Sequence, residues 1–140
     1  MSAARKFAPV PTPETLPFWE KAAQHELWLP RCADTGKVFF PPRAHSPFSG
    51  GAVDWVRASG RGDLASYVIN HRPAPGYEDE APYAIALVRL EEGPILTSNI
   101  KGIPADPAHL RIGMKLEVQF EARGEVTVPQ FGPVGKGEEA

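Results

Sequence analysis

The chain has 140 residues, of which 42% are hydrophobic and 23% charged, and its formal net charge is −2. This length suits one compact domain, and the composition is typical of globular proteins. The weak negative charge argues against a polyanionic partner such as nucleic acid or an anionic membrane. The chain has a single cysteine, no signal-peptide pattern and no stretch of roughly 20 apolar residues, so we expect a cytoplasmic protein without disulfides and without a membrane span.

The first part of the chain predicts an extended arm, a helix and a hairpin. Scattered prolines in residues 1–13 indicate a mobile arm. Apolar residues then recur at intervals of three and four over 15–26, which is typical of one amphipathic helix. Its rings Phe18 and Trp19 are candidates for contact with a partner subunit, and packing against the core is the alternative. Residues 27–40 predict two short strands around a turn at 33–36.

The second part of the chain predicts a run of strands at 53–58, 63–71, 83–90, 95–100, 115–122 and 126–128. Sixteen prolines and 13 glycines favour a fold rich in turns, with one short helical turn between 106 and 113. About five strands with one such insertion are the outline of a small Greek-key barrel such as the OB-fold.

Six short motifs occur in order along the chain: Pro17-Phe18-Trp19-Glu20, Leu29-Pro30-Arg31-Cys32, Phe39-Phe40-Pro41-Pro42-Arg43, Ser59-Gly60-Arg61-Gly62, His71-Arg72-Pro73 and Arg111-Ile112-Gly113-Met114. Together they resemble the family called domain of unknown function thirty-five, whose members join an N-terminal helix and a rubredoxin-like zinc ribbon to an OB-fold. The resemblance implies a mainly β fold, with a helix and ribbon-like hairpin at 14–51 and a five-stranded Greek-key OB-fold barrel at 52–133. A mobile arm at 1–13 and a frayed tail at 134–140 would flank them.

The zinc site of the family is degenerate in this chain. The four thiolate positions that the resemblance assigns read Cys32, Thr35, Ser46 and Ser49. Neutral hydroxyls are poor zinc ligands, and one thiolate with the nearby His45 gives two donors where a structural site needs four. We therefore expect a ribbon without metal, no cofactor, and Cys32 as an inert buried thiol.

The resemblance also implies a function in acyl-CoA chemistry, as an accessory subunit beside a thiolase-like or aldolase enzyme. The residues themselves show no nucleophile with a base, no carboxylate pair and no phosphate-binding loop, so we expect no catalysis by the chain alone. The leading interpretation is a non-catalytic acyl-CoA-binding accessory subunit of a thiolase-like or retro-aldolase complex. Whether the chain also forms a homodimer stays open.

Candidate ligand-binding residues are cations and rings in or beside the loops, because loops on a rigid barrel commonly carry binding residues. They are Arg43, Arg61, His71, Arg72, Tyr77 and Tyr83. A guanidinium group matches the geometry of a phosphate, and a solvated surface charge is the alternative for each arginine. A local hydrogen bond at a strand end is the alternative for His71.

Two other functions compete with this interpretation. An OB-fold that binds single-stranded nucleic acid would use stacking rings, here Trp55, Tyr67 and Tyr83, with nearby arginines. The acidic run 78–80 lies directly after Arg72 in the loop and would oppose a phosphate backbone. A stand-alone hydrolase or transferase acting on acyl thioesters is the third interpretation, and it lacks a recognisable catalytic set.

Overall fold

The computed structural model describes residues 8–72 and 74–134. In these ranges it contains α1 (Leu16–Ala22), β1 (Trp28–Cys32), β2 (Val53–Arg57), β3 (Arg61–Asn70), β4 (Tyr83–Leu90), β5 (Ile95–Ile100), β6 (Lys115–Arg123) and β7 (Val126–Pro133). None of the described helices has the length and apolar character that crossing a membrane requires. Residues 1–7 of the predicted arm and 135–140 of the predicted tail lie outside the described ranges.

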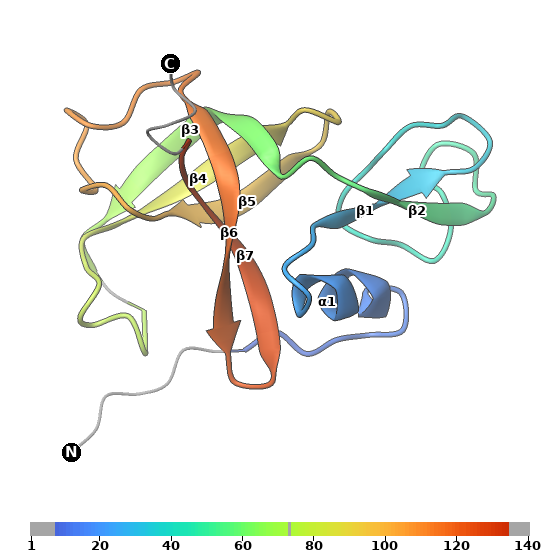
Figure 1. Cartoon of the computed structure of the whole chain (residues 1–140), viewed down its shortest axis with the longest axis horizontal. Helices are drawn as coiled ribbons and strands as arrows, with labels where there is room; N and C mark the ends of the chain where they lie inside the picture. The colour runs from blue at the N-terminus through green and yellow to red at the C-terminus, as the bar shows by residue number, and fades with distance from the viewer. Residues whose placement is uncertain (1–7, 73, 135–140) are drawn as a thin grey trace.

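The smaller part of the molecule is a two-stranded sheet of β1 and β2 (Figure 1). These strands pair antiparallel, residues 28–32 against 53–57. The hairpin predicted within 27–40 is only partly formed, because its second arm contributes a single bridge between Arg31 and Val38. β2 was predicted as the first strand of the run in the second half of the chain. In the structure it pairs with β1 and with none of the strands that follow it.

The larger part is a closed barrel in the order β3-β4-β5-β7-β6, with β6 pairing back to β3. Counted along the chain, this order is 1-2-3-5-4, which is a Greek-key arrangement and not an up-and-down one. All neighbours are antiparallel except β5 and β7, which meet in parallel through Ile100 and Phe131. The predicted mainly β fold with an OB-type barrel is thus confirmed.

β3 closes the barrel because it pairs with two strands. Its start pairs with β6, most of its length pairs with β4, and a bulge between Leu64 and Ser66 lets it bend. Gly62 lies buried at this double pairing, where a Cβ atom would collide with the carbonyl oxygen of Arg89 and approach Leu90 Cα to 3.1 Å. Only glycine fits there without displacing β4.

Inward-facing side chains fill the barrel. Leu64, Val88, Leu116 and Phe131, from β3, β4, β6 and β7, have no exposed surface. Each such apolar side chain stabilises the fold by about 1.5–3 kcal/mol relative to an exposed one. These side chains fill the interior of the barrel, so a ligand would bind outside it.

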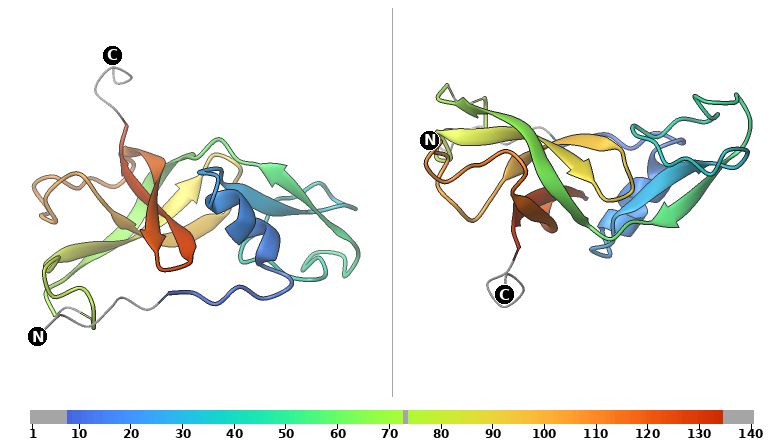
Figure 2. Two further views of the ribbon diagram at one scale, coloured as in Figure 1. Left: turned by 60° about the horizontal axis from the view of Figure 1, so that its bottom comes forward. Right: turned by 90° about the horizontal axis from the view of Figure 1, so that it is seen from above.

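α1 lies between the two-stranded sheet and the β6–β7 hairpin, as Figures 1 and 2 show. Phe18 is 4% exposed and packs edge-on against Trp19, with ring centroids 4.9 Å apart, and against Phe40 at 5.4 Å. The helix is shorter than the predicted 15–26. It ends at Ala22, and His25 then adopts a left-handed conformation with φ 62°, which stops helical continuation.

Candidate functional site

A groove with a volume of about 400 Å³ lies between α1 and the barrel and is lined mainly by apolar residues; we call it the α1 groove. Its walls come from α1, the segment 40–42, β5 and β7. The apolar part of the lining includes Phe18, Trp19, Phe40, Leu96 and Val128. A concave, mainly apolar surface with few polar groups is typical of small-molecule sites.

Polar side chains that line the groove from the barrel side include Ser98, Asn99, Gln130 and Arg123. The Ser98 hydroxyl donates to the Pro129 carbonyl oxygen at 3.1 Å, and Asn99 Nδ2 donates to the Ala84 carbonyl oxygen at 3.0 Å. Gln130 is different: it is 4% exposed, and its Oε1 atom has no hydrogen-bond partner among the described residues. A buried unpaired acceptor costs about 1–3 kcal/mol, so this atom requires an explanation.

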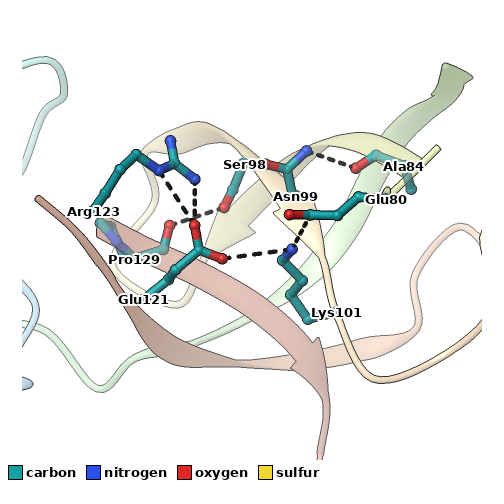
Figure 3. A network of polar contacts seen from close by, with 8 residues as sticks. All are labelled: Glu80, Ala84, Ser98, Asn99, Lys101, Glu121, Arg123 and Pro129. Atoms are coloured by element: carbon teal, nitrogen blue, oxygen red, sulfur yellow. Dashed lines mark hydrogen bonds and ion pairs between the residues drawn. The ribbon is translucent and has the colours of Figure 1, made fainter. Parts of the chain in front are cut away.

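Arg123, the charged side chain of this lining, belongs to a network of charges (Figure 3). Its Nη2 and Nε atoms lie 2.7 and 3.2 Å from Glu121 Oε2, while Lys101 Nζ lies 3.6 Å from the other oxygen of Glu121. Lys101 also donates to Glu80 at 2.7 Å. The network balances two cations with two carboxylates, and it ties the β3–β4 loop to β5 and β6.

The β3–β4 loop brings together two of the predicted site residues. The rings of Tyr77 and Tyr83 lie 5.1 Å apart, and the Arg123 guanidinium carbon lies 5.6 Å from the Tyr77 ring centroid. The Tyr83 hydroxyl accepts hydrogen bonds from Asn70 Nδ2 at 2.8 Å and Ala74 N at 3.3 Å. These contacts hold the loop in place beside the end of the groove where Arg123 lies.

His71 and Arg72 begin the same loop, directly after Asn70, which pairs with Tyr83, whereas Arg61 and Arg43 lie elsewhere. Arg61 begins β3, whereas His71 and Arg72 follow its end, and ten residues of strand separate them by about 30 Å. Arg43 lies exposed in the ribbon loop. The six candidates therefore form no single site.

Arg61 lines a second cavity of about 660 Å³ at the start of β3. This cavity mixes cations with carboxylates, and Asp63 lies across the strands from both Lys115 and Arg89. Its described lining holds four cations and two carboxylates, so Asp63 and Glu91 offset its positive charge only in part.

The stacking surface expected of a nucleic-acid binder is not assembled. Trp55 lies in β2 of the two-stranded sheet, opposite Pro30, whereas Tyr67 and Tyr83 lie in β3 and β4 of the barrel. A row of stacked bases would need these rings on one continuous face.

Sequence reasoning missed Arg123 and Gln130. The strand that holds Gln130 was expected to end at 128, because Pro129 and Gly132 indicate turns. The available signal was the spacing of two between Val128 and Gln130, which places both on one face of an extended strand.

The structure brings together the four positions of the degenerate ribbon site, Cys32, Thr35, Ser46 and Ser49. Cys32 Sγ lies 3.5 Å from Ser49 Oγ and accepts a hydrogen bond from Thr35 N at 3.4 Å. Ser46 Oγ accepts from Phe48 N at 3.0 Å and from Ser49 N at 3.2 Å. Hydrogen bonding from the Ser46 hydroxyl, and next from Thr35, lowers the pKa of the buried Cys32 thiol to about 6.

Comparisons with known proteins match both parts of the chain. Residues 19–53 match the rubredoxin-like zinc ribbon domain of ChsH2, and residues 55–121 match its C-terminal OB-fold domain. The fold superposes on a chain of the Ltp2-ChsH2(DUF35) aldolase with a TM-score of 0.81 at 33% identity, covering 91% of this chain and 100% of that one.

Two similar proteins differ in how much of their own length this chain covers. A DUF35 domain-containing scaffold protein of Methanothermobacter thermautotrophicus is 34% identical over 125 residues, which cover 85% of this chain and 92% of the relative. The probable enoyl-CoA hydratase alpha subunit of Thermomonospora curvata is 39% identical over 127 residues, and these cover 88% of this chain. The chain spans only 39% of that subunit.

The zinc that the ribbon domain's name implies does not fit the residues present. The ribbon site offers one thiolate and three neutral hydroxyls at Thr35, Ser46 and Ser49, which do not make a tetrahedral zinc site. Across residues 8–72 and 74–134, no group of three or more His, Cys, Asp or Glu side chains is placed to hold a metal ion. With both domains matched and a scaffold relative covered almost entirely, the chain belongs to the DUF35 family, as a member with a single cysteine in its ribbon.

Proposed function

We propose that this chain is a non-catalytic accessory subunit that docks on a thiolase-like or aldolase enzyme and binds acyl-CoA. The observation that carries the proposal is the likeness, at 33% identity, to a whole chain of the Ltp2-ChsH2(DUF35) aldolase. The relatives described as scaffold protein and as hydratase alpha subunit support the same kind of role.

The chemistry of the α1 groove supports a binding role without catalysis. The described residues that line it include no histidine, cysteine or carboxylate, so the groove lacks a general base and a strong nucleophile. Its apolar walls suit the acyl chain and the other parts of acyl-CoA that lie outside the nucleotide. The reaction would then belong to the partner, and this chain would position the substrate or complete the partner's site.

Trp19 is the better of the two predicted partner contacts. Both rings line the groove, but Phe18 is almost fully buried, whereas Trp19 is half-buried and more accessible to a partner. A partner surface laid over α1 would cover Trp19 and close the open side of the groove. Amphipathic rings of this kind are enriched where proteins bind one another.

Isothermal titration calorimetry of the purified chain with acetyl-CoA, together with a turnover assay, tests the proposal. We expect binding and no release of free CoA. Steady turnover by the isolated chain would contradict the non-catalytic role. Failure to bind any acyl-CoA, alone or with a partner subunit, would contradict the binding role.

A further inference from the structure

We infer that the cavity of about 660 Å³ at the start of β3 binds a small molecule through a phosphate group; we call it the β3 cavity. The inference goes beyond the proposed function, because it requires neither an acyl group nor a partner subunit. It begins from a group of cations that separate segments bring to one hollow of the surface. The charged side chains of the described lining are Arg61, Asp63, Arg89, Glu91, Arg111 and Lys115.

The pairing of β3 with two strands places two of these cations on either side of it. Asp63 lies opposite Lys115 of β6 on one side and opposite Arg89 of β4 on the other. Neighbouring strands lie about 4.8 Å apart, so the backbones at Lys115 and Arg89 are separated by about 10 Å. Side chains of this length can both reach one anion held over β3.

Arg111 reaches the same cavity from the loop before β6. Backbone hydrogen bonds fix this loop to β3: Gly113 N donates to the Leu64 carbonyl oxygen at 2.7 Å, and Leu64 N donates to the Met114 carbonyl oxygen at 3.0 Å. A turn closes between Arg111 and Met114, with the Met114 amide donating to the Arg111 carbonyl oxygen at 3.0 Å. The backbone that carries Arg111 is therefore held in place before a ligand arrives.

Three of the cations have no competing partner. Arg89, Arg111 and Lys115 are exposed, and their side chains make no hydrogen bond or ion pair with any part of the chain that the structure describes. Arg61 is different, because it lies opposite Glu117 of β6, and the inference does not depend on it. A guanidinium fork matches the oxygens of a phosphate, and an exposed lysine adds a point charge.

The carboxylates limit the charge that the β3 cavity accepts. Asp63 and Glu91 reduce the positive charge of the described lining to an excess of two. A phosphate monoester carries about −1.5 to −2 charges at pH 7 and three acceptor oxygens, so its charge is of the matching size. A nucleic-acid strand would bring further phosphates against the carboxylates, and the candidate stacking rings Trp55, Tyr67 and Tyr83 lie outside this lining.

The uncharged part of the lining suits the organic part of a phosphate ester. It includes Leu90, Met114, Leu116 and Pro133. A volume of about 660 Å³ lies within the range of small-molecule sites. The phosphate group is the shared chemistry of two sources, a phosphorylated small molecule and free inorganic phosphate, and these walls favour the first.

A ¹H–¹⁵N NMR titration of the full chain tests the inference, because it gives both the affinity and the place of binding. The probes are AMP, inorganic phosphate, and adenosine as the body of AMP without its phosphate. We expect AMP to shift the backbone amide signals of Gly62, Met114 and Lys115, which line the cavity. Inorganic phosphate should shift the same signals at higher concentration, and adenosine should leave them unchanged.

Three variants separate a built site from general charge attraction. Arg111→Gln should weaken AMP about tenfold, the usual effect of one lost charge-assisted hydrogen bond. Arg43→Gln is the matched control, because Arg43 is an exposed arginine of the ribbon loop outside the cavity lining, and its removal changes the net charge equally. Asp63→Asn should strengthen AMP binding about threefold, since it removes a carboxylate that repels the phosphate. Each variant should keep its Tm within about 2 °C of wild type, which shows that it is folded.

The outcomes decide both the site and its occupant. Shifts confined to the cavity, with opposite effects of Arg111→Gln and Asp63→Asn, support the inference. Inorganic phosphate that binds as tightly as AMP supports it too and identifies the free anion as the source. Equal weakening by Arg43→Gln, absence of shifts at the cavity, or equal shifts with adenosine would overturn it. Tighter binding of a short single-stranded oligonucleotide than of AMP would also overturn it, because a nucleic-acid strand would then be the occupant.

Discussion

The pair of Arg123 and Glu121 should stabilise the fold measurably, because it is shielded from water. The side chains are 13% and 27% exposed, and two guanidinium nitrogens share one carboxylate oxygen at 2.7 and 3.2 Å. Exposed pairs contribute about 0.2–1 kcal/mol, and breaking a fully buried pair costs about 3–5 kcal/mol. For this intermediate burial we expect a coupling energy of about 1–2 kcal/mol.

A double-mutant cycle with Arg123→Met, Glu121→Gln and the double variant measures this coupling. Each protein is unfolded in urea, and a loss of about 1.5 kcal/mol should lower the midpoint by about 1 M at the slope usual for this size. Arg123→Met should cost more than Glu121→Gln, because it also removes the contact with the Tyr77 ring.

The pair of Arg31 and Asp54 provides the matched comparison within the same chain. It has the better fork geometry, with bonds of 2.9 and 3.0 Å, but its side chains are 41% and 45% exposed. If burial decides the strength, its coupling should be the smaller of the two. A coupling below about 0.3 kcal/mol for Arg123 and Glu121, or a larger one for the exposed pair, would refute this reasoning.

Three further predictions concern the ribbon and the barrel. A chelator should leave the Tm unchanged, because the ribbon lacks a tetrahedral ligand set; a shift of several degrees would show a bound metal. Since the pKa of Cys32 is lowered from its ordinary value of 9.0 to about 6, its contribution to stability should be complete above pH 9, decline as the pH falls, and be lost below about pH 6. Urea unfolding of wild type and Cys32→Ser across this range measures it, and an unchanged pH slope in the variant would contradict it. Gly62→Ala should lower the Tm by roughly 10 °C, or about 3 kcal/mol, because the added methyl group meets the Arg89 backbone; a Tm within 2 °C of wild type would show that β4 shifts easily.

Periodicity and turn residues predicted the elements with strong local signals. β4 to β6 lie within about a residue of their expected bounds, because alternating apolar residues and the Gly93 turn define them. The helix and β7 were predicted poorly for physical reasons. Apolar spacing continues to Leu27, but the left-handed backbone at His25 ends the helix, and tertiary pairing with β6 carries β7 through two prolines.

The site was harder to predict than the fold, because it forms between segments distant in the sequence. The groove needs α1, the segment 40–42, β5 and β7 at once, and no local pattern places α1 against β7. Tyr77 and Tyr83 were found together because one loop joins them. Arg61 and His71 were grouped by residue type, and the length of β3 separates them.

Affinity capture of the tagged chain from its own cells tests the central claim most directly, with the eluate analysed for protein partners and for bound thioesters. We expect a stoichiometric aldolase or thiolase-like subunit that carries the catalytic activity, together with acyl-CoA. Recovery of the chain alone, or with nucleic acid and no such subunit, would contradict it.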